Sequence, residues 1–313
     1  MLIDLSWTVM ACLVMLGIVM DCLLGEVRRW HPLSGFGNLA GWVEKCMNRN
    51  HGSRLQGVMA WLIVVVPFVV LSWILTLWLA EHHFLLAMLA HALMLYFCLG
   101  LRSLRDHILP IAHALREGDL VLARTLTGRI VSRDTTALSE ADLAKAGVES
   151  LLENGNDAVF GTLFWFLVAG GPGAVLFRLA NTLDAMWGYR TARFAQFGWA
   201  AARIDDALNI ITARLTALSY ALLGNTRLAS QCWRRQAPQW SSPNAGPVMS
   251  AGAGALNISL GGDAIYDGEV EHRPVLGSGP RATGKDIARA WKLVSRTTAL
   301  WMFVIALIGV TNA

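Results

Sequence analysis

The sequence is short of charge. Asp, Glu, Lys and Arg make up 15% of its 313 residues, against about 25% in an ordinary soluble domain. The hydrophobic content of 55% excludes an intrinsically disordered chain, and a net charge of only +4 gives no support for nucleic-acid binding. With a mean hydropathy of +0.46, the composition predicts an integral membrane protein. Thirteen Trp residues fit a protein with wide water–lipid boundaries.

Cysteine is scarce too, and several sequence motifs are missing. The five cysteines are Cys12, Cys22, Cys46, Cys98 and Cys232. None lies in a C-x-x-C pair, so we expect free thiols. Neither G-x-S-x-G nor H-E-x-x-H occurs, so hydrolases and zinc proteases lack their residues. Residues 279–286 nearly match a phosphate-binding loop, but Asp286 replaces the required Ser or Thr. We therefore interpret Thr283 and Asp286 as a helix cap.

Long uncharged runs are abundant. A bilayer core takes about 20 apolar residues of helix, and residues 57–80 and 84–101 each provide such a run. Residues 5–24 and 297–312 provide a first and a last span. We predict an all-α polytopic membrane protein with four transmembrane helices, a re-entrant helical hairpin and cytoplasmic helical loops. These form a single integral membrane domain over residues 1–313.

The hairpin is predicted over residues 158–180, where Ala169-Gly170-Gly171-Pro172-Gly173 interrupts an apolar run and breaks a helix. Basic residues follow the first and third spans, so those segments are expected in the cytoplasm. A full crossing at 158–180 would place the next basic stretch outside, which favours a return to the cytoplasmic side. The segment 207–226 contains Arg214, and whether it crosses is open. We expect the cytoplasmic (inner) cell membrane, with the site facing the cytoplasm.

A polar helix with acidic side chains precedes the hairpin. Ser139 begins a capping box and Asn154-Gly155 is a stop signal, so residues 140–153 are predicted to form one helix. Besides Glu140 at its start, the acidic residues on it and just after it are Asp142, Glu149, Glu153 and Asp157. The first three share one stripe of the helix. The stripe is either a solvated acidic face or part of a site at the rim of the hairpin.

A second polar group follows the hairpin. Its members are Asn181, Asp184, Tyr189, Arg203, Asp205, Asp206, Asn209 and Arg214. Arg203 and Asp206 are spaced to form an ion pair within one helix, which is the structural interpretation. The functional one is that a dense group of charges beside apolar segments marks a site. Carboxylate and amide oxygens suit Mg²⁺, so the group is a candidate magnesium site.

These segments, in this order, resemble the adenosylcobinamide-phosphate synthase family of cobalamin biosynthesis, called CobD or CbiB. The matching pieces are Asp21 through Gly25 with His31-Pro32, Ser132-Arg133-Asp134-Thr135, Val148-Glu149 with Glu153-Asn154 and Asp157, Asn181 through Asp184 with Gly188-Tyr189, Ala202 through Asp206 with Asn209 and Ala213-Arg214, and Ser242 through Gly246 with Leu260-Gly261-Gly262. They cover nearly the whole chain. Each piece is weak alone, but so many in register are specific.

The resemblance implies an amide-forming ligase. Family members join aminopropanol or aminopropanol phosphate to a propionate carboxyl of adenosylcobyric acid, with ATP as the activator and Mg²⁺. The implied catalytic residues are Glu149, Glu153, Asp157, Asp184, Asp205 and Asp206, of which Glu153, Asp157, Asp205 and Asp206 are candidate Mg²⁺ ligands. The implied substrate-binding residues are Arg133, Asp134, Asn154, Asn181, Tyr189, Arg203, Asn209, Arg214, Ser242 and Asn244. The lipid bilayer and other corrinoid-pathway proteins are expected partners, and nucleic acid is not.

The chain departs from the family pattern at several positions. Met249 stands where the family has an acidic residue, Asn257 and Thr162 replace an expected glycine and proline, and Glu26-Val27 replaces Asp-Pro. Met249 keeps a second hypothesis open, a membrane regulator or sensor that has the fold without the chemistry. A transporter, suggested by the broken hairpin and by His91, is a third. A lone His91 is more simply a hydrogen-bonded packing residue.

Overall fold

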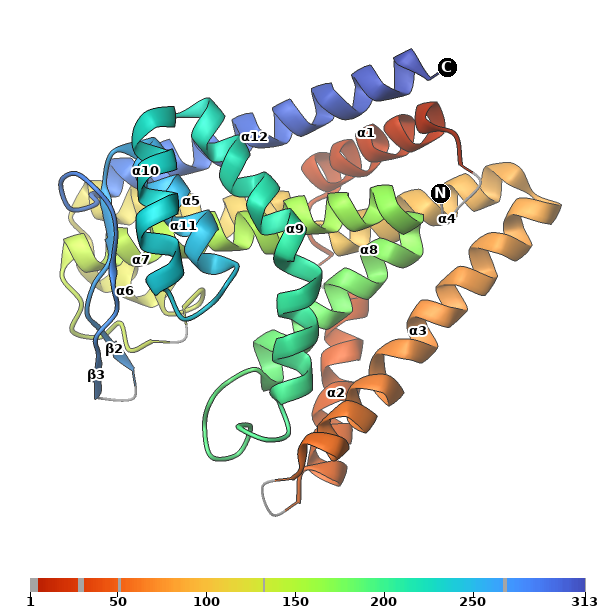
Figure 1. Cartoon of the computed structure of the whole chain (residues 1–313), viewed down its shortest axis with the longest axis horizontal. Coiled ribbons are helices and arrows are strands. Elements are labelled where there is room, and N and C mark those ends of the chain that lie inside the picture. Colours follow the sequence, from red (N-terminus) through yellow and green to blue (C-terminus); the bar gives the residue numbers. More distant parts are fainter. Residues whose placement is uncertain (1–4, 28–30, 50–51, 132, 267–268, 313) are drawn as a thin grey trace. The chain divides into compact units, whose positions relative to one another are not determined.

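The computed structural model is almost entirely helical (Figure 1). It describes residues 5–27, 31–49, 52–131, 133–266 and 269–312. The chain divides into two compact units, each built from segments that are distant in the sequence. The first comprises Met1–Leu101, Asp157–Asn209 and Met302–Ala313, and the second Arg102–Asn156 and Ile210–Trp301. That the whole chain is a single membrane domain stays a prediction.

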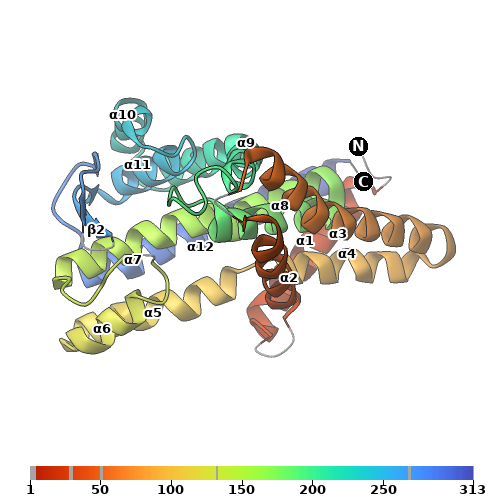
Figure 2. The same cartoon turned by 90° about the horizontal axis from the view of Figure 1, so that it is seen from below.

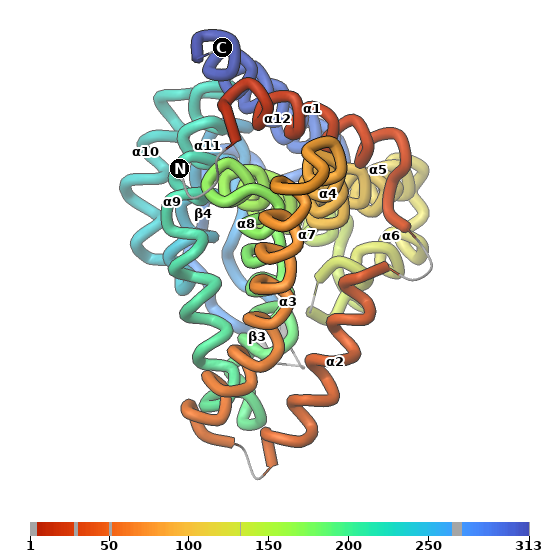
Figure 3. The backbone as a smooth tube through the Cα atoms, turned by 90° about the vertical axis from the view of Figure 1, so that its right-hand side faces the viewer, coloured from red at the N-terminus to blue at the C-terminus, as the bar shows by residue number. Residues whose placement is uncertain are grey.

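Long helices build the first unit. They are α1 (Trp7–Leu24), α2 (Pro32–Met47), α3 (Arg54–His82), α4 (Phe84–Cys98), α8 (Gly161–Trp187), the beginning of α9 (Trp199–Leu223) and the end of α12 (Gly284–Thr311). Helices α3 and α4 run antiparallel and side by side (Figures 1 and 2). Helix α1 lies beside the end of α12, where the Thr8 hydroxyl donates to the Gly309 carbonyl at 2.9 Å (Figure 3).

Local sequence explains where α3 begins and what it buries. The Ser53 hydroxyl accepts from the Gln56 N–H at 3.3 Å, and the Gln56 side chain accepts from the Ser53 N–H at 2.7 Å, which is a complete capping box. One side of α3 packs against α2, α8 and α9 in an apolar core. Its residues are Phe36, Ala40, Val43, Ala60, Trp61, Val64, Val65, Leu179, Ala180, Leu183, Trp187, Phe197 and Ala201.

Helix α8 is bent back on itself. Ala169 and Gly170 leave the helical conformation, and Gly170 has φ 61° and ψ −150°, which favours glycine. A Cβ at Gly161 would overlap the ring of Phe177. In a straight helix these two residues would be about 24 Å apart. The two halves of α8 therefore lie side by side as a hairpin, with the break where the sequence predicted it.

The turn of this hairpin is anchored to α4. The buried His91 Nδ1 accepts a hydrogen bond from the Gly171 N–H at 2.9 Å. This bond satisfies a backbone donor that the break in α8 leaves without a helical partner. The predicted packing role of His91 is therefore confirmed.

Five helical segments are long and apolar enough to cross a membrane. They are Trp7–Leu24, Arg54–His82, Phe84–Glu117, Glu140–Trp187 and Gly284–Thr311. The all-α polytopic fold class is thereby confirmed. Four of the segments contain the predicted spans and the fifth contains the hairpin, whereas α9 is not among the candidates within the described residues. The re-entrant depth of the hairpin and the side it faces stay predictions.

The second unit combines helices with short strands. Its helices are α5 (Leu101–Glu117), α6 (Leu120–Thr127), α7 (Glu140–Gly155), the rest of α9, α10 (Thr226–Gln236), the 3₁₀ turn η3 (Ala237–Gln239), α11 (Ala245–Leu256) and most of α12. Strand β1 (Ser259–Gly261) pairs antiparallel with β4 (Val275–Gly277), and β2 (Ala264–Tyr266) with β3 (Glu269–Glu271). Helices α10 and α11 pack together (Figure 2). The sequence had not predicted these strands.

Helix α7 begins where the sequence predicted, but the chain stays helical beyond Asn154-Gly155. The Ser139 hydroxyl accepts from the Asp142 N–H at 3.3 Å and caps the helix. Beyond Gly155 the chain continues as a π-helical turn, η2 (Asn156–Phe160), directly into α8. Gly155 is a packing residue here, because a Cβ would lie 2.7 Å from the Tyr220 hydroxyl. The stop signal was wrong because glycine serves close approach as well as helix ends.

Candidate active site

The first unit holds a buried carboxylate between two amides. Asp205 of α9 is 8% exposed. It accepts hydrogen bonds from Asn181 Nδ2 of α8 at 3.3 Å and from Asn209 Nδ2 at 3.1 Å. Asn209 is four residues further along α9, so both amides are positioned by helices. The structure thus brings together three of the residues that the sequence singled out.

Further carboxylates surround this group. Burial raises the pKa of Asp205 well above its ordinary 3.8, and the charges of Asp157 and Asp184 raise this pKa further, against the opposing amide hydrogen bonds. Burial also raises the pKa of Asp206, although the neighbouring Arg203 and Arg190 oppose the shift. A carboxyl whose pKa lies closer to neutrality than usual is suited to proton transfer. The cluster is therefore a candidate reaction centre.

Arg203 forms the ion pair that the structural interpretation expected. Its Nη1 lies 3.4 Å from Asp206 Oδ2, one helical turn away, and its side chain is 59% exposed. An exposed pair of this kind contributes at most about 1 kcal/mol. Arg203 is therefore held at the edge of the carboxylate cluster, on the same helix as Asp205.

Arg178 of α8 is a candidate that the sequence analysis missed. It lies within electrostatic reach of Asp157 and Glu26, and its buried Nε has no hydrogen-bond partner in the described part of the chain. Charged residues inside an apolar span are costly and are by default functional. The available signal was a single Arg inside an otherwise uncharged run.

The second unit places Glu149 in a buried network of charges. Glu149 Oε2 lies 3.0 Å from Arg133 Nη2 and 3.3 Å from Arg273 Nη2, and Glu149 Oε1 accepts from the Gly261 N–H at 2.7 Å. All three charged side chains are at most 10% exposed. Arg273 also covers the ring of Trp240. Glu149 is thus an ion-pair partner that joins α7 to β1.

The acidic stripe of α7 is divided among different roles. Asp142 accepts from the Ser139 hydroxyl at 2.6 Å and pairs with Lys145 at 3.5 Å. Glu149 is in the buried network, and Glu153 is half-buried further along the helix. The stripe is therefore neither a uniformly solvated face nor a single group of ligands.

Arg214 is held by the segment Ser242 through Gly246, one of the pieces that carry the family resemblance. Its Nη1 donates to Asn244 Oδ1 at 2.6 Å, and Asn244 is buried. The Ser242 hydroxyl accepts from the Asn244 and Ala245 N–H groups and so holds the turn before α11. These three predicted residues form one contiguous group.

The remaining predicted residues make local contacts. Asp134 is exposed and accepts from the Thr136 N–H at 2.8 Å. Asn154 donates to the Ser150 carbonyl one turn earlier in α7. Tyr189 is 47% exposed in the loop after α8. Ser132 lies outside the described residues.

The metal prediction can be compared with the arrangement of donors. Among the described residues, no three His, Cys, Asp or Glu side chains are grouped as ligands of one metal ion. Mg²⁺ needs only one or two protein carboxylates and takes its other ligands from water and phosphate. The hard oxygens of Asp205 and its neighbouring acids fit that chemistry, so the Mg²⁺ assignment stays a prediction.

Two departures from the expected pattern have a structural account. Asn257 caps α11 with φ 56°, a left-handed conformation that glycine adopts freely and Asn tolerates better than most residues. Met249 is 2% exposed within α11, whose residues are all buried. The position without a carboxylate is thus a packed interior site.

Comparison with known proteins gives the family. A family profile described as CobD/Cbib protein matches residues 14–294. The "Cobalamin biosynthesis protein CobD" of Stutzerimonas stutzeri is 54% identical over 295 residues, 92% of this chain and 94% of the relative. Those of Chromobacterium violaceum and Rhodobacter capsulatus are 53% and 38% identical, over 91% and 96% of this chain and 92% and 98% of theirs. No solved structure matches. The chain belongs to the CobD/CbiB family and has a role in cobalamin biosynthesis.

Proposed function

We propose that this membrane protein is a ligase that forms an amide between a propionate carboxyl of adenosylcobyric acid and aminopropanol or aminopropanol phosphate. The observation that carries the proposal is the buried Asp205 between Asn181 and Asn209. A raised carboxyl pKa in a protected position suits a base that takes a proton from the substrate ammonium, so that the neutral amine can attack. Cleavage of ATP to ADP and phosphate would remove the oxygen that the new amide displaces.

We assign each residue of the Asp205 group a role in the proposed reaction. Asp205 accepts the proton of the amine, and Asn181 and Asn209 hold its carboxyl in place. Arg178, with an unpaired Nε, binds the corrinoid propionate, because a guanidinium fork fits a carboxylate. Asp157, Asp184 and Asp206 complete the negative surroundings and favour the positively charged amine. Substrate orientation by fixed groups of this kind is worth several powers of ten in rate.

Mg²⁺ is the metal that this donor set fits. When bound, it would neutralise phosphate charge and stabilise the charge that develops on phosphate during activation. Of the predicted ligands, Asp157, Asp205 and Asp206 belong to the first unit and would hold the ion there, whereas Glu153 belongs to the second unit. Two further pairs of predicted residues, Glu149 with Arg133 and Arg214 with Asn244, connect segments of the second unit.

The cellular setting is part of the same proposal. We place the protein in the cytoplasmic membrane with its site facing the cytoplasm, because basic residues follow the first and third spans. The corrinoid and the amine would then reach the site from the cytoplasm. Other corrinoid-pathway proteins are the expected partners at that surface.

A non-catalytic regulator of the same fold is the alternative. It is favoured by Met249, which lies where the family has an acidic residue. Because Met249 is buried within α11, an acidic side chain there would be shielded from solvent. The intact Asp205 group argues for catalysis, and the ligation assay decides between the two.

The test is a ligation assay on the detergent-purified protein with adenosylcobyric acid, Mg·ATP and either amine, followed by the mass of the corrinoid. A mass gain equal to the amine minus water, dependent on ATP, is the expected result. The better amine identifies the substrate. The absence of product under conditions in which another family member is active would favour the regulator.

A further inference from the structure

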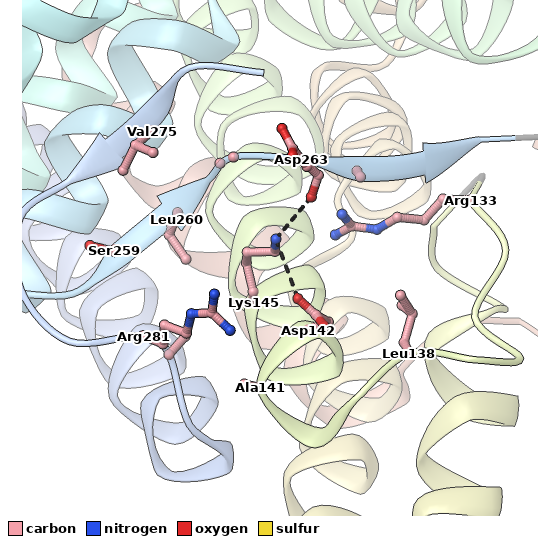
Figure 4. Close-up of a pocket in the computed structure, with 14 residues that line it drawn as sticks. Arg133, Leu138, Ala141, Asp142, Lys145, Ser259, Leu260, Asp263, Val275 and Arg281 are labelled. Carbon is pink, nitrogen blue, oxygen red and sulfur yellow. Dashed lines mark hydrogen bonds and ion pairs between the residues drawn. The ribbon is translucent and has the colours of Figure 1, made fainter. Parts of the chain in front are cut away.

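The second unit contains a polar cavity that the proposed chemistry has not used. Its volume is about 520 Å³, a size typical of small-molecule sites. Helix α7, the segment before it, strand β1 and the segment before α12 line it (Figure 4). Three basic side chains, Arg133, Lys145 and Arg281, come from three of these elements and point toward one another across the cavity (Figure 4).

A buried network of charges lies behind the cavity. Arg133 and Arg273 both contact the carboxylate of Glu149, and all three side chains are buried. Only the Nη2 group of Arg133 has a partner among the described residues, which is Glu149. The donors that remain belong to a side chain that lines the cavity.

Lys145 and Arg281 are the other two cations of the cavity. Lys145 lies 3.5 Å from Asp142 and donates to the Asp263 carbonyl at 3.2 Å. These contacts hold its ammonium in the cavity (Figure 4). The Arg281 side chain is exposed and makes no hydrogen bond or ion pair with the residues that the structure describes. The charged residues that line the cavity are thus three basic ones, Arg133, Lys145 and Arg281, and two acidic ones, Asp142 and Asp263.

We propose that this cavity binds a phosphate group, with Arg133, Lys145 and Arg281 contacting its oxygens. Phosphate offers several strong acceptors to cations that converge from different directions, and Arg presents a fork that matches it. The inference deepens the proposed function, on which the choice of ligand rests. The phosphate would belong either to ATP or to aminopropanol phosphate, and the experiment distinguishes these sources.

Equilibrium dialysis measures the binding of labelled ATP and, separately, of labelled aminopropanol phosphate to the detergent-purified full-length protein. Inorganic pyrophosphate serves as a competitor without nucleoside or amine. Lys145→Met and Arg281→Ala each remove one cation, and Arg235→Ala is the matched control, because Arg235 is an exposed arginine of the same unit outside the cavity. Arg133 is not replaced, because losing its charge would leave Glu149 with a single buried partner.

Loss of one charge-assisted hydrogen bond should weaken binding about tenfold or more. We expect Lys145→Met and Arg281→Ala to weaken binding of one ligand by that factor. Binding by Arg235→Ala, and the thermal unfolding midpoint of every variant, should stay as in the wild type. The affected ligand identifies the source of the phosphate. The proposal is overturned if wild-type protein binds neither ligand, or if both variants bind as wild type does.

The ligation assay, run in parallel, separates this proposal from the proposed function. Product formation together with unaltered phosphate binding in both variants would sink the cavity proposal alone. Weakened binding in the variants, with no product from the wild-type protein, would support the cavity and sink the ligase.

Discussion

Asp205 ties the stability of the first unit to its chemistry. Its carboxyl is buried, and two further acids act on it, so the charged form is disfavoured in the folded protein. A group of this kind weakens the fold at the pH at which it must work. Active sites commonly trade stability for function in this way. The trade can be measured, because it depends on pH with a definite sign.

We predict that Asp205→Asn changes both properties. The folded state raises the pKa of Asp205 above 3.8, so its contribution to stability is greatest below that pH and is lost as the pH rises through the folded-state pKa. The variant should therefore gain thermal stability relative to wild type as the pH rises above about 4. Ligation should fall about a hundredfold or more, as for loss of a general base. Unfolding midpoints from pH 4 to 8 and kcat check both.

Asp134→Asn supplies a control of opposite sign. Hydrogen bonds from the Thr136 N–H and hydroxyl lower the pKa of Asp134, which is exposed. Its carboxylate therefore stabilises the fold above the unfolded-state pKa, and this contribution is lost as the pH falls. The Asp134 variant should lose stability relative to wild type as the pH rises. The same trend in both variants would contradict the assignment for Asp205.

At single positions the sequence identified which residues are candidates for the site better than it identified their contact partners. Asp205 and Asn209 could be paired from their spacing of four on one helix. Asn181 could not be placed beside them, because its approach depends on α8 folding back. Glu149 was assigned to chemistry because neither Arg133 nor Arg273 is near it in sequence. Arg178 was passed over because one cation in an apolar run resembles a boundary of that run.

The hairpin of α8 is the element whose form depends most on glycine. The ring of Phe177 occupies the space that a side chain at Gly161 would need. The turn needs Gly170 for its positive φ, and His91 holds the next N–H. Small residues that let helices approach closely are the usual means of packing helices inside membranes. The close contact between the two halves should therefore be sensitive to a single methyl group.

Gly161→Ala should lower stability by about 1–3 kcal/mol, as overpacking of an interior usually does. The matched control is Gly41→Ala in α2, where nothing lies within 4 Å of a new Cβ. It should be neutral or raise stability by about 0.5–1 kcal/mol. Phe177→Leu, added to Gly161→Ala, should restore part of the loss. Thermal unfolding in detergent measures all three, and a fully stable Gly161→Ala would show that the halves do not interlock here.

The sequence was most informative about elements with strong periodicity or strong caps. Ser139 begins a helix as the capping box predicted, and the break at Ala169 and Gly170 lies where Gly and Pro gather. The continuation of the helix beyond Gly155 was missed because Gly155 serves contact with Tyr220. Strands β1 to β4 were missed because three-residue strands bury too little surface to leave a hydrophobic pattern.

For the whole molecule, the open question is on which side of the membrane each connection between helices lies. The contact of Gly161 with Phe177 brings the two ends of the hairpin together. A chain that enters and leaves at the same end of a hairpin returns to the side it came from. Basic residues follow the third span and also follow the hairpin, so the charge rule predicts that both connections lie in the cytoplasm. The turn between α3 and α4 is then expected outside.

Single cysteines in a variant without the five natural ones test this arrangement in intact cells with a membrane-impermeant maleimide. Glu81, Glu117 and Thr191 are exposed, and they lie respectively in the last turn of α3, before the hairpin and after it. We expect Glu81→Cys to react at once, and Glu117→Cys and Thr191→Cys to react only after permeabilisation. Reaction of Thr191→Cys alone, with Glu117→Cys protected, would mean a full crossing by α8. Reaction of both would reverse the orientation and leave the return intact, because the hairpin constrains only that the two positions share a side.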